Sequence, residues 1–424
     1  MKKYSVACLI FLSVLAKGQI VSVPESDLHA SERLLQDFIS YDSLYVKKRS
    51  EAAIKAKILA KKVFELEAKG YNTSCLHQIL YEAGSLLYSS ADFALINKRL
   101  NELETAISNP EAQTSIEVKD SADDSYGRCY NEWFLKVVAS YNQLEKIAGD
   151  NSAPHPLPRF LDRIDTPEKL ENYLTSISVS DIRKTGVDND REYNEMHATL
   201  LEMIIKGSPQ NYVVDSTLKK SLLNMLFNKL RNPVTGWWGE SYIRAGHKEF
   251  VDNLSTTFHT ISYLKGKVPD MDKVIATLFV VKNVPYPVGW LWKNEYWNHN
   301  NMDVVTLFKY GWHQVNEQRR NEMTNEIDKM LQWCLTVSLQ TDGSFKAIPE
   351  DSSIEEAQYY GISFLARIGY FDKSQRFWTN KEFPESDIIK GKLISYIKQH
   401  KNTGGSGGDY YKGALEALGY DGPK

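Results

Sequence analysis

A glycine–aromatic turn, Gly343-Ser344-Phe345, stands shortly before a helix-favouring segment that begins near Glu356. The same arrangement recurs along the C-terminal half of the chain, with glycine-containing turns at 236–239, 289–290 and 404–408. The acidic residues that follow the four turns are Asp252, Asp303, Glu356 and Asp409, which are 51, 53 and 53 residues apart. A regular spacing of this length is the sequence signature of a repeat architecture.

Each repeat of about 53 residues has room for one helical hairpin. Apolar residues keep a helical spacing over 34–39, 58–64, 200–205 and 222–227, and strand-like alternation is nearly absent. Because one hairpin cannot bury its apolar face alone, neighbouring hairpins must stack. We therefore expect an all-α fold, in the form of an α/α toroid whose inner ring of helices is wrapped by an outer ring. An open α-solenoid is the alternative.

Two breaks suggest how the chain is organised. Residues 108–125 are polar and acidic, and residues 149–158 contain three prolines. Such stretches are typical of segments between compact regions. We predict a helical N-terminal region over 25–150 and a toroid domain over 155–424, and the sequence leaves the role of the first region open.

The first residues resemble a secretory signal peptide over 1–18. Lys2 and Lys3 supply a positive start, an apolar core of eleven residues runs from Val6 to Ala16, and Gly18 offers a cleavage site before Gln19. Eleven apolar residues are too few to span a bilayer, which takes roughly 20. We expect a protein exported to the periplasm or secreted by a bacterium, with no membrane anchor after cleavage.

The composition excludes some partners and leaves the cysteine pairing open. The net charge of −3 becomes about −6 without Lys2, Lys3 and Lys17, and no basic stripe with interleaved aromatics occurs, so nucleic acid is not an expected partner. The mature chain retains Cys75, Cys129 and Cys334. At most one disulfide can therefore form within the chain, and the sequence does not identify the pair.

Two segments resemble the repeats of terpenoid cyclases and protein prenyltransferases. These are Gln340-Thr341-Asp342-Gly343-Ser344-Phe345 with the later Tyr359-Tyr360-Gly361, and Gly407-Gly408-Asp409-Tyr410-Tyr411 with Ala414-Leu415. The acidic motifs Asp-x-Asp-Asp and Asp-Asp-x-x-Asp of terpene chemistry are missing. The resemblance implies the toroid fold, which many periplasmic polysaccharide lyases and hydrolases share, and a terpenoid cyclase activity is the less favoured outcome.

Tryptophans concentrate between 237 and 297, where five of the nine in the chain occur. Aromatic faces in exposed loops suit the C–H faces of sugar rings and other apolar ligands. We expect a cleft that binds an oligosaccharide or another small ligand. The predicted ligand-binding residues are Trp237, Trp238, Trp290, Trp292, Trp297, His259 and Asp252.

The run from Asn298 to Asp303 is the most concentrated chemical feature. In polysaccharide lyases of this fold, an Asn neutralises the uronate carboxylate, a His or Tyr abstracts the α-proton, and a Tyr protonates the leaving oxygen. By that resemblance, His299 is the expected base, Asn298 or Asn301 the neutraliser, Tyr242 the acid and Arg244 the substrate anchor.

Other interpretations of the same residues stay open. A glycoside hydrolase would use two carboxylates, for which Glu240, Glu295 and Asp303 are candidates. The acids that begin helices also suit capping of free N–H groups. No cofactor or metal site is predicted, although the sequence leaves a divalent cation open. The alternative to an enzyme is a non-catalytic toroid that binds a peptide, a lipid or a partner protein.

Overall fold

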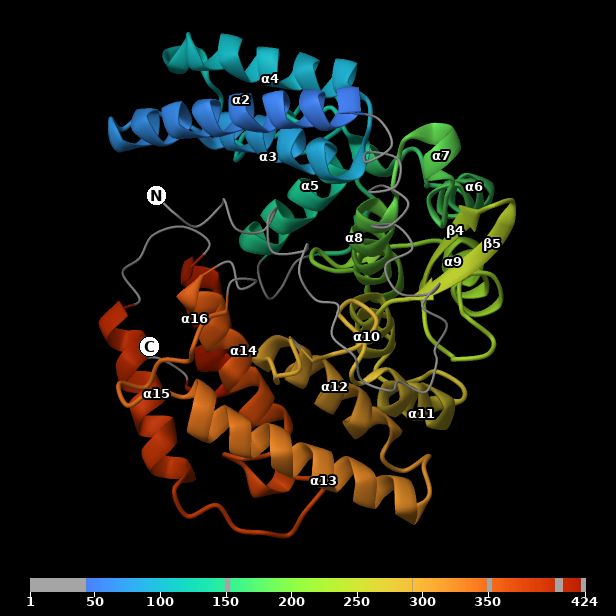
Figure 1. Ribbon diagram of the computed structural model, residues 1–424, viewed down its shortest axis with the longest axis vertical. Helices are drawn as coiled ribbons and strands as arrows, with labels where there is room; N and C mark the ends of the chain where they lie inside the picture. The colour runs from blue at the N-terminus through green and yellow to red at the C-terminus, as the bar shows by residue number, and fades with distance from the viewer. Residues whose placement is uncertain (1–42, 149–152, 292, 349–352, 401–406, 421–424) are drawn as a thin grey trace. The chain divides into compact units, whose positions relative to one another are not determined.

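The computed structural model describes residues 43–148, 153–291, 293–348, 353–400 and 407–420 (Figure 1). Within these residues the chain is mostly helical, with fifteen α-helices and few strands, so the all-α prediction is confirmed. The chain divides into two compact units between Tyr263 and Leu264. We call the described residues before this point the N-terminal unit and those after it the C-terminal unit. The break expected near residue 150 lies inside the N-terminal unit, where α5 packs against α8 across it.

The N-terminal unit contains nine helices and five short strands within the described residues. The helices are α2 (Ser43–Ala68), α3 (Ser74–Ser89), α4 (Phe93–Ile107), α5 (Trp133–Ile147), α6 (Pro167–Ile177), α7 (Ile182–Thr185), α8 (Asp190–Leu200), α9 (Ser216–Asn228) and α10 (Leu254–Tyr263). The strands are β1 (His155–Pro156), β2 (Val179–Ser180), β3 (Tyr212–Val213), β4 (Gly239–Arg244) and β5 (His247–Asp252). A π-helical segment, Leu201–Lys206, continues α8 and ends at Gly207, whose φ of 77° suits glycine.

Helices α2, α3 and α4 form a layer with its own apolar core. Leu59, Leu76 and Leu100 are completely or almost completely buried in it. Glu82 on α3 and Arg99 on α4 form a buried ion pair, and the Glu82 carboxylate also accepts from the backbone N–H groups of residues 131 and 132. A disulfide joins Cys75 to Cys129 with a Cα–Cα distance of 5.5 Å, whereas Cys334 is a buried free thiol. Together these links tie α3 and α4 to the segment that leads into α5.

A β-hairpin follows the glycine-containing turn at 236–239, in a region where no strands were expected. Strands β4 and β5 pair antiparallel from Gly239↔Asp252 to Arg244↔His247, and β2 adds in parallel at Ser180↔Tyr242. A Cβ at residue 239 would lie 1.9 Å from the carbonyl oxygen of Val251, so only glycine permits this approach. The periodicity favoured helix throughout and missed this hairpin, because neither the buried β4 nor the partly exposed β5 alternates clearly between apolar and polar residues.

The C-terminal unit alternates two sets of helices. One set is α11 (Met271–Val281), α13 (Glu317–Trp333) and α15 (Ser386–His400), and the other is α12 (Asn298–Gly311), α14 (Ile354–Arg367) and α16 (Gly407–Ala417). In the second set, α12 packs against α14 and α14 against α16 (Figure 1). The three helices begin 56 and 53 residues apart. A π-helical segment, Cys334–Ser338, continues α13.

Several sequence expectations have a definite outcome. Glu356 lies in the first turn of its helix as expected. Asp303, however, lies in the second turn of α12, and Asp252 ends β5 instead of opening a helix. The signal peptide over 1–18 and the apolar pattern over 34–39 lie outside the described residues. None of the described helices is long and apolar enough to cross a membrane.

Candidate functional site

Rings from α12, α14 and α16 form a continuous aromatic array in the C-terminal unit. Consecutive centroids are 4.8 Å apart for Trp297–His299, 4.0 Å for His299–Tyr360, 5.2 Å for Tyr359–Tyr360 and 5.8 Å for Tyr359–Tyr410. His299 and the three tyrosines are only half-buried. The array therefore runs from the first turn of α12 across the first halves of α14 and α16.

His299 shares one face of α12 with Asp303. The two residues are four positions apart, so their side chains lie one above the other on the helix surface. The His299 ring is stacked almost parallel on Tyr360, with an interplanar angle of 8°. The Tyr360 hydroxyl has Asp303, Glu356, Tyr359 and Tyr410 as its electrostatic neighbours. A base, a phenol and two carboxyls therefore converge on the α12–α14 face.

Burial raises the pKa values of the two central groups at this face. Asp303 is 1% exposed, and this desolvation raises its pKa well above the ordinary value against the smaller opposing effect of Arg367. Burial also raises the pKa of Tyr360 well above its ordinary value. Both shifts favour the protonated forms, and a protonated carboxyl or phenol can donate a hydrogen bond.

The three asparagines of α12 are buried, with different partners. Nδ2 of Asn298 donates to Ser338, and Nδ2 of Asn300 donates to the carbonyl of Trp290. Neither side-chain atom of Asn301 has a hydrogen-bond partner within the described residues, and the same holds for Oδ1 of Asp303. Asn301 lies two positions from His299, which is roughly 200° around the helix. It therefore does not share the face of His299 and Tyr360.

The expectation of tryptophans exposed in loops is wrong for the described ones. Trp237 and Trp238 are 0% exposed, Trp290 is 1% exposed and Trp297 is 7% exposed. Nε1–H of Trp238 donates to the carbonyl of Leu226, and the Trp290 and Phe308 rings pack edge to face. Large apolar rings gain more from burial in the core than from an exposed loop, and the sequence pattern does not separate the two cases. Trp292 lies outside the described residues.

A second polar cluster, formed around Glu240, lies in the N-terminal unit. The Glu240 carboxylate, 1% exposed, accepts from the Ser180 hydroxyl, and its Oε2 lies 2.9 Å from the Tyr242 hydroxyl. The same hydroxyl lies 3.2 Å from Oδ1 of Asp188. Burial, followed by the charges of Asp188 and Asp190, raises the pKa of Glu240 well above its ordinary value. Both oxygens of Glu240 and the hydroxyl of Tyr242 thus have partners inside the fold.

The remaining predicted site residues also belong to the N-terminal unit. Arg244 lies on the hairpin 4.0 Å from Glu249. Asp252 accepts from Asn232 and Thr235 and so fastens the turn before β4. His259 stacks on Tyr263 at 5.6 Å, and burial lowers its pKa to about 4. In the structure these side chains support the hairpin and α10. Glu295, a hydrolase candidate, is exposed in the C-terminal unit.

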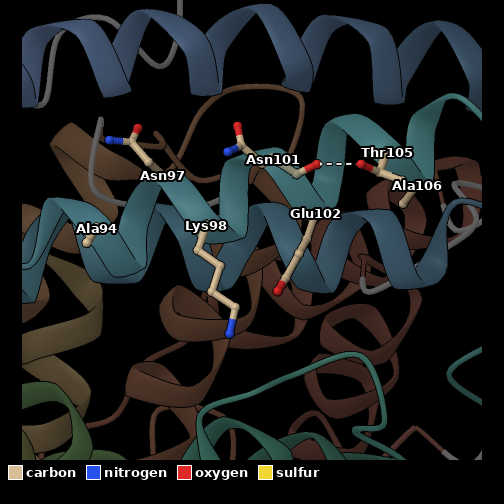
Figure 2. Close-up of a pocket in the computed structure, with 7 residues that line it drawn as sticks. All are labelled: Ala94, Asn97, Lys98, Asn101, Glu102, Thr105 and Ala106. Atoms are coloured by element: carbon tan, nitrogen blue, oxygen red, sulfur yellow. Dashed lines mark hydrogen bonds between the residues drawn. The ribbon is translucent and has the colours of Figure 1, made fainter.

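A hollow on α4 does not resemble a catalytic site (Figure 2). All the residues that line it come from this one helix, and none of them is aromatic: Ala94, Asn97, Lys98, Asn101, Glu102, Thr105 and Ala106. Within the described part of the chain, no three His, Cys, Asp or Glu side chains are placed to hold a metal ion.

Sequence reasoning missed Tyr360, Tyr359 and Tyr410 as site residues. All three stand in the repeat segments Tyr359-Tyr360-Gly361 and Tyr410-Tyr411, so the repeat itself carried the signal. No family model matches the chain, and searches of curated proteins and of solved structures likewise find no match. Function must therefore be inferred from the chain's own residues.

Proposed function

We propose that the chain is an exported, carbohydrate-active enzyme with an α/α-toroid fold. It would cleave an oligosaccharide by β-elimination at the N-terminal ends of α12, α14 and α16. The observation that carries the proposal is the His299 ring stacked at 4.0 Å on Tyr360, on the face where Asp303 is buried. The alternate packing of α12, α14 and α16, with starts 56 and 53 residues apart, supports the toroid.

The aromatic array supports sugar binding. His299, Tyr359, Tyr360 and Tyr410 are half-buried, so each offers part of a ring to a ligand while the rest is held by its neighbours. Tyrosine joins an apolar face to a polar tip, which suits a ring that carries both C–H groups and hydroxyls. The array thus takes the ligand-binding role that was predicted for Trp237, Trp238 and Trp290.

The proposed reaction needs one base and one acid. His299 removes the proton on the carbon next to the uronate carboxylate, and the C–H electron pair forms the new C=C bond. The adjacent C–O bond breaks, and its electron pair stays on the leaving oxygen, which takes a proton from Tyr360. The high pKa of Tyr360 keeps that proton in place until the oxygen becomes basic. Water then returns the proton from His299 to the Tyr360 oxygen. Tyr360 replaces Tyr242 as the donor, because the Tyr242 hydroxyl already contacts Glu240 and Asp188.

A panel of acidic polysaccharides tests the proposal. The purified protein should produce unsaturated uronate, which is measured by its ultraviolet absorbance. His299→Ala should abolish this signal, and His247→Ala, at an exposed hairpin position, is the matched control and should leave it unchanged. Turnover that persists in His299→Ala contradicts the site. Oligosaccharide binding without any turnover would favour the non-catalytic alternative.

Export is tested separately from activity. If the predicted signal is processed, bacterial expression of the full chain should give an extracytoplasmic protein whose first residue is Gln19, by mass spectrometry. A protein that stays in the cytoplasm with residues 1–18 intact contradicts export and leaves the test of His299 unaffected.

A further inference from the structure

We propose that α2 is the contact surface of a homodimer, in which one exposed face of this helix pairs antiparallel with the same face of a second copy of the chain. Residues on this face recur at alternating intervals of four and three along the helix, which places them in one stripe. They are Lys47, Glu51, Ile54, Ile58, Lys61 and Glu65, and all of them are exposed. We call this stripe the α2 face.

The centre of the α2 face is apolar. Ile54 is 60% exposed and Ile58 is 54% exposed, although α2 also has a buried side that carries Ala52, Leu59 and Val63. The buried side belongs to the core that α2 shares with α3 and α4, and the two isoleucines are not part of that core. Single exposed apolar residues are common, but two isoleucines one turn apart form a continuous patch. Burial of this patch against another apolar surface is favourable.

The charges on either side of the patch identify the partner. When two copies of α2 are aligned antiparallel on their isoleucines, Ile54 lies opposite Ile58 of the second copy. The same alignment places Glu51 opposite Lys61 of the second copy, and Lys47 opposite Glu65. Each of these contacts then occurs twice, as the two-fold symmetry of a homodimer requires. The order of charges along α2 is therefore complementary to itself when one helix is reversed.

The charged side chains of the α2 face also select the antiparallel orientation. Nζ of Lys47 lies 3.9 Å from Oε1 of Glu51, and Nζ of Lys61 lies 3.7 Å from Oε1 of Glu65. In the antiparallel dimer the first pair faces the second pair of the other copy, so that four charges alternate in sign around a square. A parallel pair in register would instead set lysine against lysine and glutamate against glutamate, which like charges oppose.

Lysines beside the α2 face have a partner of opposite charge on α4. Lys55 donates to Oδ1 of Asn101, and its Nζ lies 2.7 Å from Oε2 of Glu104. Lys62, two turns along the helix from Lys55, is an electrostatic neighbour of the same Glu104. The carboxylate on α4 therefore offsets part of the positive charge at this edge, where the lysines of two copies would otherwise repel each other.

Mixing two charge-reversed variants tests the pairing. A contact between two single helices lies at the low end of interface sizes, so the wild type should form a weak dimer with a micromolar dissociation constant in sedimentation equilibrium. Glu51→Lys sets lysine against lysine at two symmetry-related contacts, and Lys61→Glu sets glutamate against glutamate. Each variant alone should dimerise about tenfold or more weakly than the wild type. An equimolar mixture restores opposite charges at both contacts and should form a heterodimer about as tight as the wild-type dimer.

The mixture separates pairing from folding, because a fold damaged in either variant is not repaired by adding the other. Ile58→Asp should abolish the dimer, and Val234→Asp, at a position that is 79% exposed in the loop after α9, is the matched control and should leave it unchanged. A wild type that stays monomeric at near-millimolar concentration overturns the inference. So does a mixture that associates no better than the separate variants, or a dimer that survives Ile58→Asp. A dimer that forms only after removal of residues 1–42 would assign the α2 face to that segment and would also overturn the inference.

Discussion

The two buried polar clusters of this protein differ in how completely their hydrogen bonds are made. In the N-terminal unit, both oxygens of Glu240 have partners, from Ser180 and Tyr242. In the C-terminal unit, Oδ1 of Asp303 and both amide atoms of Asn301 have none within the described residues. An unpaired buried polar group costs about 1–3 kcal/mol, so stability does not explain why Asp303 is retained. In the proposed function, the face of α12 that carries Asp303 is the site and the Glu240 cluster holds the fold.

Removing one hydroxyl from each cluster gives the largest expected effects. Tyr360→Phe removes the proposed proton donor and should lower kcat by about 10²–10⁴-fold with little change in folding. Ser180→Ala should leave kcat unchanged and lower the free energy of unfolding by about 1–3 kcal/mol, because a carboxyl oxygen of Glu240 loses its partner. Steady-state kinetics and urea unfolding of both variants measure this contrast. The reverse pattern would mean that the two clusters have been assigned the wrong way round.

Removing a core tryptophan tests whether the tryptophans are structural. Trp238 is fully buried, its ring lies 6.0 Å from Phe227, and Arg231 lies 5.0 Å above it. Trp238→Ala should therefore cost about 3–5 kcal/mol of unfolding free energy. Trp238→Phe keeps most of the apolar volume and should cost clearly less. An Ala variant of unchanged stability with weakened sugar binding would restore Trp238 to a ligand-binding role.

Asn301, which does not share the face of His299 on α12, allows a test of the two clusters with a smaller expected effect. Asn301→Leu removes two unpaired polar atoms and keeps a similar volume, so it should raise the free energy of unfolding by about 1–2 kcal/mol. Tyr242→Phe, in the cluster around Glu240, should lower the free energy of unfolding by about 1–3 kcal/mol, because Glu240 and Asp188 lose a partner. Differential scanning calorimetry gives both values. Destabilisation by Asn301→Leu would show that the amide is satisfied in solution.

Sequence patterns predicted the helical class, because helical spacing of apolar residues is local and recurs over most of the chain. They also located the helix that carries His299 and Asp303, although it begins at Asn298 and not at Asp303. The hairpin of β4 and β5 was missed, since neither strand shows a clear apolar–polar alternation. The same limit explains the tryptophans. The chemistry of Trp238 is identical in a cleft and in a core, and only the packing of Leu226 and Phe227 against it decides between them.

The sequence patterns did not reveal that Tyr360 stacks on His299, for a related reason. Tyr360 is 61 residues away along the chain, and nothing in either local pattern relates the two rings. The repeat predicted that α12 and α14 are equivalent, yet it did not give the side chain that each presents to the other. The stacking at 4.0 Å follows from the rotation of the two helices, which tertiary packing determines.

Glu240→Gln tests the polar cluster around Glu240 through the pH dependence of protein stability, and its expected effect is the smallest. The folded-state pKa of Glu240 lies well above that of the unfolded chain, near 4.5, mainly because of burial. As the pH rises above that value the unfolded state loses its proton while the folded state keeps it. The stability of the wild type should therefore fall with rising pH until Glu240 itself ionises. Glutamine stays neutral, so the variant should gain stability relative to the wild type between pH 4.5 and pH 8 in urea unfolding. Parallel stability curves for the two proteins would mean that Glu240 is ionised in the fold, and the cluster would then have to be regarded as a charged site.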